Sequence, residues 1–222
     1  MPARKPKRVE AKSEATRRRL LERALVLFQK RGVEATTMRD IARAAGLSLG
    51  AAYYYFPSKE ALVFAYYEEH QRGMEDLAAR ATGTLRERLG AIFHGKLDSI
   101  RAQRKMLAAI VQRLVDPGDP LSAFSKQSRD VRERAIAVIE DVLEHVPAEV
   151  RPLAASALWL LMLSLMLVYI NDDSPGEART HGLVDDALDM VVAMLPMLAT
   201  PMGKALVDRV TASLGRAGIK LT

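Results

Sequence analysis

The chain contains no cysteine, one tryptophan and only 5% aromatic residues. The absence of cysteine excludes disulfides, thiolate metal ligands and cysteine nucleophiles. The four histidines, at positions 70, 94, 145 and 181, show no metal-ligand spacing. The sequence also lacks a phosphate-binding loop, a nucleophile elbow and a zinc motif. We therefore predict that the protein is not an enzyme, with no catalytic residue, no metal and no cofactor.

Long apolar segments are scarce as well. The basic start, MPARKPKRVEAKSEATRRR, is followed by no apolar run, so we expect no secretory signal and a cytoplasmic location. Residues 153–170 (LAASALWLLMLSLMLVYI) reach the lower length limit of a membrane span. Amphipathic helices precede and follow this segment, and it contains Ser156 and Ser164. A helix buried in a core or a subunit interface explains it better, and a membrane span is the alternative.

Positive charge is concentrated in the first 60 residues. They carry 14 Lys and Arg against 6 Asp and Glu, whereas residues 61–222 carry 19 against 21. This asymmetry suggests a polyanionic partner, such as nucleic acid or an acidic membrane surface, for the N-terminal part. The alternative is a solvated basic tail.

Helical periodicity runs through nearly every long segment, without convincing β alternation, and predicts an all-α fold. A first helix should end at Gly32. Thr37 is placed to cap a short second helix, with Asp40 as its capping-box partner and Gly46 as its C-terminal stop. Ser48 should cap a third helix, and a fourth begins near Lys59, after a break at Pro57-Ser58.

Beyond residue 60 the predicted helices lengthen. One amphipathic stripe extends over residues 85–114, about eight turns, before DPGDP breaks it. Further helices are expected at 131–146, at 153–170, at 183–195 and after Pro201.

The segment ATTMRDIARAAGLSLGAAYYYFPSKEAL, preceded by LLERALVLFQKRG, carries a specific pattern. Its elements are Ala24…Leu27-Phe28…Gly32, Thr36-Thr37, Ile41-Ala42…Ala45-Gly46, Ser48 and Gly50, Tyr53…Phe56, and Ser58-Lys59-Glu60…Leu62. In these positions the chain resembles the tetracycline-repressor (TetR/AcrR-like) family of bacterial transcriptional regulators. The resemblance covers roughly residues 16–65. The rest matches the family only in being helical and of suitable length.

The resemblance implies an N-terminal three-helix helix-turn-helix DNA-binding domain and a C-terminal helical ligand-binding and dimerisation domain. We expect a flexible basic arm over 1–15, the DNA-binding domain over 16–62, and the effector-binding domain over 63–222. It further implies a homodimer on a pseudo-palindromic double-stranded DNA operator, repression as the usual outcome, and release by an unidentified small hydrophobic effector. The helices at 153–170 and 183–195 would then form an intersubunit four-helix bundle.

Nine residues are expected to contact DNA: Thr37, Arg39, Ser48, Leu49, Gly50, Ala51, Tyr53, Tyr54 and Lys59. Helix N-termini, tyrosine hydroxyls and a flexible lysine suit phosphate, and Gly50 permits close approach of the backbone. The third helix contains no Arg, Lys, Asn or Gln, so it lacks the strong base readers. Arg39 matches a position that reads guanine in some family members. Each residue also has a structural interpretation as a cap, a stop or a solvated charge.

The aromatic run at the end of the third helix should divide. Phe56 is predicted to anchor inward, Tyr53 and Tyr54 to face outward, and Tyr55 to pack partly with its hydroxyl at the edge.

Flexible or large apolar residues suggest a ligand pocket further along the chain. The candidate lining residues, each with a core role as the alternative, are Phe93, Met106, Trp159, Met162 and Met166.

Overall fold

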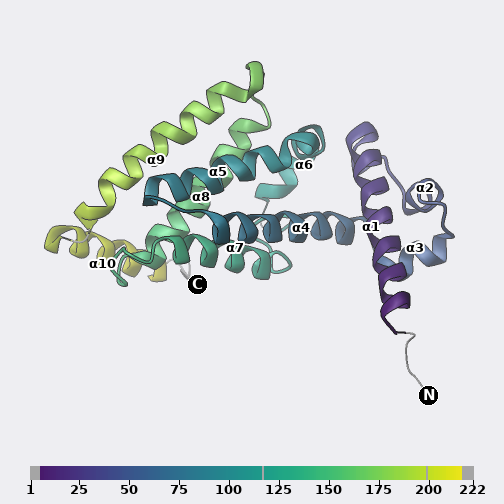
Figure 1. The fold of residues 1–222 in the computed structure, drawn as a ribbon, viewed down its shortest axis with the longest axis horizontal. Coiled ribbons are helices and arrows are strands. Elements are labelled where there is room, and N and C mark those ends of the chain that lie inside the picture. Colours follow the sequence, from purple (N-terminus) through teal and green to yellow (C-terminus); the bar gives the residue numbers. More distant parts are fainter. Residues whose placement is uncertain (1–5, 117, 199, 217–222) are drawn as a thin grey trace. The chain divides into compact units, whose positions relative to one another are not determined.

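The structure is a computed structural model that describes residues 6–116, 118–198 and 200–216. The described residues are helical, with no strand (Figure 1), as the sequence predicts. They form two compact units. Unit 1 takes the chain up to Glu69 together with Ala102–Ser128, and unit 2 takes His70–Arg101 together with the chain from Arg129 onward. The sequence predicts a single boundary at residue 62, whereas the first boundary between the units falls after Glu69. In addition, residues 102–128 belong to the N-terminal unit.

Unit 1 contains α1 (Pro6–Arg31), α2 (Met38–Ala44), α3 (Leu49–Tyr55), the start of α4 (Lys59–Arg80) and α6 (Arg104–Val115). Helix α1 packs against both α2 and α6. Its core side chains include Leu20, Ala24 and Phe28, each at most 1% exposed and spaced four residues apart. Because α1 begins at Pro6, residues 6–15 are helical, whereas the sequence predicts a flexible arm there. Lys, Arg, Glu and Ala, all good helix formers, dominate that stretch.

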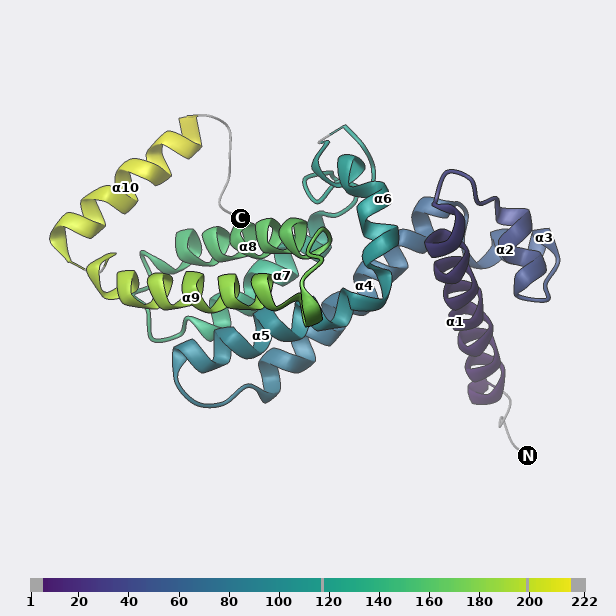
Figure 2. The ribbon, with the colours of Figure 1, turned by 90° about the horizontal axis from the view of Figure 1, so that it is seen from above.

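Unit 2 contains the end of α4, α5 (Leu85–Ile100), α7 (Arg129–Val142), α8 (Arg151–Tyr169), α9 (Ala178–Leu198) and α10 (Pro201–Arg216). Helix α5 packs against α7, α8 and α9, and α7 packs against α8 (Figure 2). Helix α10 packs against α9. The predicted helices at 131–146, 153–170 and 183–195 correspond to α7, α8 and α9.

The predicted eight-turn stripe over 85–114 is not one helix. A 3₁₀ turn, η1 (Arg101–Gln103), separates α5 from α6. Neither Pro nor Gly marks the break, and the apolar spacing continues across it. The two halves nevertheless serve different cores, because Leu97 and Ile100 are buried in unit 2 and Met106 and Ile110 in unit 1.

Helix α8 is, by length and composition, apolar enough to cross a membrane. Of its most apolar 18-residue window, 44% is buried inside unit 2. Leu158, Met162 and Leu165 are among its buried residues. This partial burial agrees with the interpretation of α8 as a helix buried in a core or a subunit interface.

Candidate nucleic-acid interface

The second helix is held by a complete capping box. The backbone N–H of Asp40 donates to Thr37 Oγ1 over 3.2 Å, and the backbone N–H of Thr37 donates to Asp40 Oδ2 over 3.1 Å. The side-chain and backbone hydrogen bonds from Thr37 hold the pKa of Asp40 below its ordinary value. The predicted cap is thus confirmed, and it fixes the start of α2 from residues three apart in the sequence.

The turn between α2 and α3 depends on a glycine and a serine. Gly46 has φ +67°, the left-handed conformation that favours glycine at a helix end. Ser48 then caps α3, because its Oγ accepts the backbone N–H of Ala51 over 3.1 Å. Both predicted signals are confirmed, and together they give the helix-turn-helix its short connection.

The inner face of this motif is apolar. Ile41, Ala45, Ala52 and Phe56 are each at most 5% exposed, so the predicted inward position of Phe56 is confirmed. The Arg17 guanidinium of α1 lies 4.9 Å from the centroid of the Phe56 ring, a cation–π contact. These contacts fix which side of α3 remains open to solvent.

The open side presents the tyrosines. Tyr53 is 48% exposed and Tyr54 is 82% exposed. Tyr55 is partly buried, stands edge-on to Tyr54, and accepts a 3.5 Å hydrogen bond from Ser13 Oγ with its hydroxyl. The predicted division of the aromatic run is therefore confirmed. The hydroxyls of Tyr53 and Tyr54 can each donate a hydrogen bond to an acceptor outside the chain.

Gly50 lies on the same open side. A Cβ at this position would meet no atom within 4 Å, so the packing of this chain does not require glycine there. Glycine in a helix costs roughly 0.5–1 kcal/mol relative to alanine. Close approach of an outside surface explains its presence better than internal packing.

Arg39 and Ser48 are also exposed, and Leu49 and Ala51 are partly exposed.

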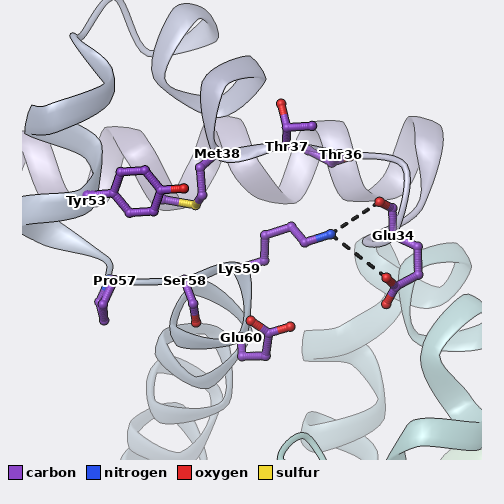
Figure 3. Close-up of a pocket in the computed structure, with 9 residues that line it drawn as sticks. All are labelled: Glu34, Thr36, Thr37, Met38, Tyr53, Pro57, Ser58, Lys59 and Glu60. Atoms are coloured by element: carbon purple, nitrogen blue, oxygen red, sulfur yellow. Dashed lines mark hydrogen bonds and ion pairs between the residues drawn. The ribbon is translucent and has the colours of Figure 1, made fainter.

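Lys59 is engaged inside unit 1. Its ammonium donates to the carbonyl oxygens of Val33, over 2.7 Å, and Glu34, over 3.2 Å (Figure 3). The Glu34 carboxylate lies 4.0 Å away. This geometry makes Lys59 a brace for the loop that leads into α2, and its contact with phosphate stays a prediction.

Three predicted contact residues meet at one hollow of about 350 Å³, namely Thr37, Tyr53 and Lys59. The hollow is also lined by Glu34, Thr36, Met38, Pro57, Ser58 and Glu60 (Figure 3). The other six predicted contact residues are not part of this lining. The loop before α2 and the turn before α4 therefore share one concave surface.

Arg113 on α6 completes this region, and no sequence motif marks it. Its Nε donates to Asp119 over 2.8 Å, and its Nη1 donates to Glu34 over 2.5 Å. The Glu60 carboxylate lies 3.6 Å from its Nη2. The hydrogen bond to Asp119 raises the pKa of Arg113 and lowers that of Asp119. Glu34 thus ties α6 to the same loop that Lys59 braces.

The predicted ligand residues do not all belong to one unit. Phe93, Trp159 and Met162 are buried in unit 2, and Met166 is partly exposed there. Met106 is fully buried but belongs to unit 1. The break at η1, which the apolar periodicity hides, explains why the sequence groups them together.

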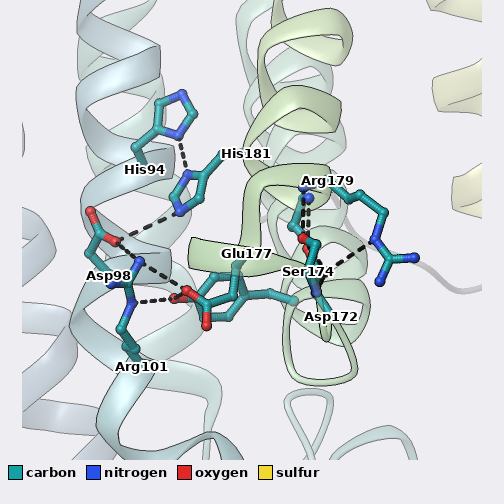
Figure 4. A network of polar contacts seen from close by, with 10 residues as sticks. His94, Asp98, Arg101, Asp172, Ser174, Glu177, Arg179 and His181 are labelled. Carbon is teal, nitrogen blue, oxygen red and sulfur yellow. Dashed lines mark hydrogen bonds and ion pairs between the residues drawn. The ribbon is translucent and has the colours of Figure 1, made fainter.

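A polar network ties α5 to α9 and its preceding turn in unit 2 (Figure 4). The Nδ1 atoms of His94 and His181 lie 2.7 Å apart, and His94 Nε2 lies 3.0 Å from Asp185. Arg101 pairs with Glu177 over 2.9 Å. Arg86 and then His94 hold the pKa of Asp185 below its ordinary value. Distant histidines are thus brought together, which their sequence spacing does not indicate.

The start of α9 has its own carboxylate cap. Thr180 donates to Asp172 Oδ2 from its backbone N–H over 2.8 Å and from its hydroxyl over 2.6 Å. Hydrogen bonds from Thr180 and then Ser174 hold the pKa of Asp172 below its ordinary value.

Among the described residues, no group of three or more His, Asp or Glu side chains is arranged to hold a metal ion.

Two family descriptions match the chain. "Bacterial regulatory proteins, tetR family" matches residues 20–66, and "Tetracyclin repressor-like, C-terminal domain" matches residues 88–211. The chain belongs to the TetR family. This family comprises transcriptional regulators with a helix-turn-helix DNA-binding domain, not enzymes.

Named relatives agree with this assignment. The HTH-type transcriptional repressor KstR2 of Rhodococcus jostii is 36% identical over 136 residues, covering 61% of this chain and 53% of that protein. The HTH-type transcriptional regulator AcrR of Shigella flexneri is 26% identical over 202 residues, covering 86% and 93%. The chain spans about half the length of the KstR2 proteins that it matches.

Solved structures share the fold. A TetR-family transcriptional regulator from Streptomyces coelicolor aligns with a TM-score of 0.62 and 26% identity, covering 90% of this chain and 89% of that one. The TetR transcriptional regulator from Nitrosomonas europaea aligns with a TM-score of 0.64 and 19% identity, covering 79% and 97%.

Proposed function

We propose that this protein is a repressor that binds a pseudo-palindromic operator as a homodimer and is released by a small hydrophobic effector. The observation that carries the proposal of DNA binding is the solvent-exposed side of α3. There Gly50, Tyr53 and Tyr54 are open to an outside surface, on a helix whose N-terminus is capped by Ser48. Repression is favoured because the KstR2 relatives are named repressors. The proposal places the protein in the cytoplasm, in contact with DNA and not with a membrane.

The proposed DNA contacts fall into two classes. Thr37, Ser48 and the hydroxyls of Tyr53 and Tyr54 suit phosphate oxygens, which position a protein without reading sequence. Arg39, exposed on α2, is the candidate for direct base readout. Leu49 and Ala51 offer only apolar contacts, so the shape and deformability of the operator must supply part of the specificity.

An exposed apolar stripe on α9 supports the homodimer. Leu183, Met190, Met194 and Met197 are 43–65% exposed. Their spacing of seven, four and three residues places them on one side of the helix. Leu160 and Val168 of α8 are each 46% exposed. Exposed apolar side chains grouped on one side of a helix favour an interaction site, and two-fold pairing through them would match a palindromic operator.

Unit 2 supplies the proposed effector site. Phe93 on α5 and Trp159, Met162 and Met166 on α8 belong to helices that pack together. Buried aromatic and methionine side chains suit an apolar ligand. Met106 is left out of this proposed lining because it belongs to unit 1.

DNA binding is tested by fluorescence anisotropy with the duplex upstream of the protein's own gene and a shuffled duplex of equal length. We expect at least 10³-fold tighter binding to the native duplex at physiological salt, with affinity falling steeply as salt rises. Equal affinity for the two duplexes would overturn operator recognition. A reporter gene behind the same upstream region then separates repression from activation.

Dimerisation is tested by sedimentation equilibrium of the wild type and of Met194→Glu. The wild type should sediment as a dimer and the variant as a monomer, because a charge would be buried in the apolar interface. Asp186→Asn, an exposed change on the same helix, is the control. A monomeric wild type would rule the dimer out.

A further inference from the structure

A lysine stands in the middle of the apolar face of α5. Lys96 lies seven residues after Leu89, three after Phe93 and four before Ile100, which places all four on one face of the helix. The other three side chains are at most 1% exposed. A charged residue therefore occupies a position that the helix otherwise gives to its core.

Solvent reaches the apolar face at this point. Lys96 is partly exposed, although its neighbours on the stripe are completely buried. The stem of Lys96 therefore runs along the apolar face, and its ammonium lies toward the edge of the packing. The surroundings are nevertheless poorly hydrated, because burial lowers the pKa of Lys96 to about 8. A lysine that extends fully into water would keep its ordinary value.

The ammonium has no partner within the described residues. Burial alone shifts its pKa, without a contribution from a nearby carboxylate, and no described side chain pairs with it. Three other charged side chains of α5 behave differently. Arg86 pairs with Asp185, Arg88 with Glu144, and Asp98 with Arg101. A poorly hydrated, unpaired cation costs free energy, so a partner from outside the chain would relieve it.

We propose that Lys96 is the anion-binding residue of the effector site in unit 2, and that the effector is an apolar molecule that carries one carboxylate. The inference deepens the proposed function, on which it rests for the role of the ligand. In this proposal, Phe93, one turn away on the same face, supplies the apolar part of the site together with Trp159 and Met162, which are buried on the helix α8 that packs against α5. A monoanion fits because one lysine neutralises one charge, whereas a phosphate dianion would leave a second charge unpaired in a poorly hydrated place.

The probes are octanoate, dodecanoate and hexadecanoate, each paired with the alcohol of the same chain length and used below its micellar concentration. Trp159 is the only tryptophan of the chain, so its fluorescence reports binding directly at the proposed site. The full-length protein should bind at least one carboxylate about tenfold or more tightly than the matched alcohol, as expected for a hydrogen bond between charged groups.

Two variants identify the residue responsible. Lys96→Met keeps the length and apolar character of the side chain and should bind the carboxylate no more tightly than the alcohol. Lys96→Arg keeps the charge and should retain the preference. A circular-dichroism melt confirms that each variant is folded. The proposal is overturned if the wild type binds none of the carboxylates, if it binds carboxylate and alcohol equally, or if Lys96→Met keeps the preference.

Operator anisotropy, measured on the same samples, separates this inference from the proposed function. If the protein binds its operator but shows no Lys96-dependent carboxylate binding, the inference fails and DNA recognition stands. If it binds carboxylate through Lys96 but not DNA, the site stands and the repressor proposal fails. In the expected case, the bound carboxylate weakens operator binding in the wild type and not in Lys96→Met.

Discussion

Lys59 at the start of α4 and Lys96 on α5 are two partly buried lysines in opposite situations. Lys59 donates to the carbonyls of Val33 and Glu34, so two of its three N–H donors are used within unit 1. Lys96 stands on an apolar face of unit 2 without a described partner. The comparison shows that a lysine within a DNA-binding motif, such as Lys59, can have a structural role. A lysine on an apolar helix face, such as Lys96, is the one for which we propose a ligand.

The largest effect is expected from Lys59→Met. The substitution leaves the carbonyls of Val33 and Glu34 without their donor, so we expect a loss of about 1.5–3 kcal/mol in the free energy of unfolding. Urea denaturation measures it. Lys30→Met, an exposed change near the end of α1, is the control and should be close to neutral. An unaltered stability together with a large loss of DNA affinity would restore Lys59 as a phosphate contact.

Arg113→Met should follow, with a loss of roughly 1–2 kcal/mol, because it breaks the charge-assisted contacts with Asp119 and Glu34. Operator affinity should also fall, since Glu34 belongs to the loop that leads into α2. Arg209→Met on α10, an exposed arginine, is the matched control. A loss of stability without any loss of operator affinity would show that α6 does not position the DNA-binding helices.

Lys96→Met should act in the opposite direction and stabilise the ligand-free protein, because it removes an unpaired charge from an apolar face. The sign follows from the pKa of Lys96, which is about 8 in the folded chain and higher when unfolded. The charged lysine destabilises the fold fully below pH 8, and this cost disappears as the pH rises toward the unfolded value. Melting temperatures of wild type and variant should therefore converge between pH 8 and 10. A difference that does not change with pH would mean that the ammonium is hydrated.

The smallest effect on stability is expected from Tyr54→Phe, because that hydroxyl is on a side chain 82% exposed. Its loss should leave the melting temperature unchanged and weaken operator binding several-fold, about 1 kcal/mol for one hydrogen bond. Tyr55→Phe is the counterpart, since its hydroxyl faces Ser13 inside unit 1. Equal operator affinities for the two variants would argue against Tyr54 as a phosphate contact.

The sequence by itself determined the helix-turn-helix, because its signals are local. The Thr37–Asp40 capping box and the Ser48–Ala51 cap each join residues three apart, and Gly46 has the positive φ that glycine adopts readily at a helix end. The alternation of buried and exposed residues on α3 follows from helical periodicity once the caps fix its ends. Hence the orientation of Phe56, Tyr53 and Tyr54 could be predicted.

Only the tertiary structure decided which distant groups meet. Arg113 pairs with Glu34 across 79 residues and His94 with His181 across 87, and such pairings leave no periodic trace in the sequence. The same holds for the break at η1, where one apolar stripe divides between two cores. The roles of Lys59 and Lys96 depend on the same physical fact, because a charge is satisfied by whatever the folded chain places within about 3 Å of it, and not by its neighbours in sequence.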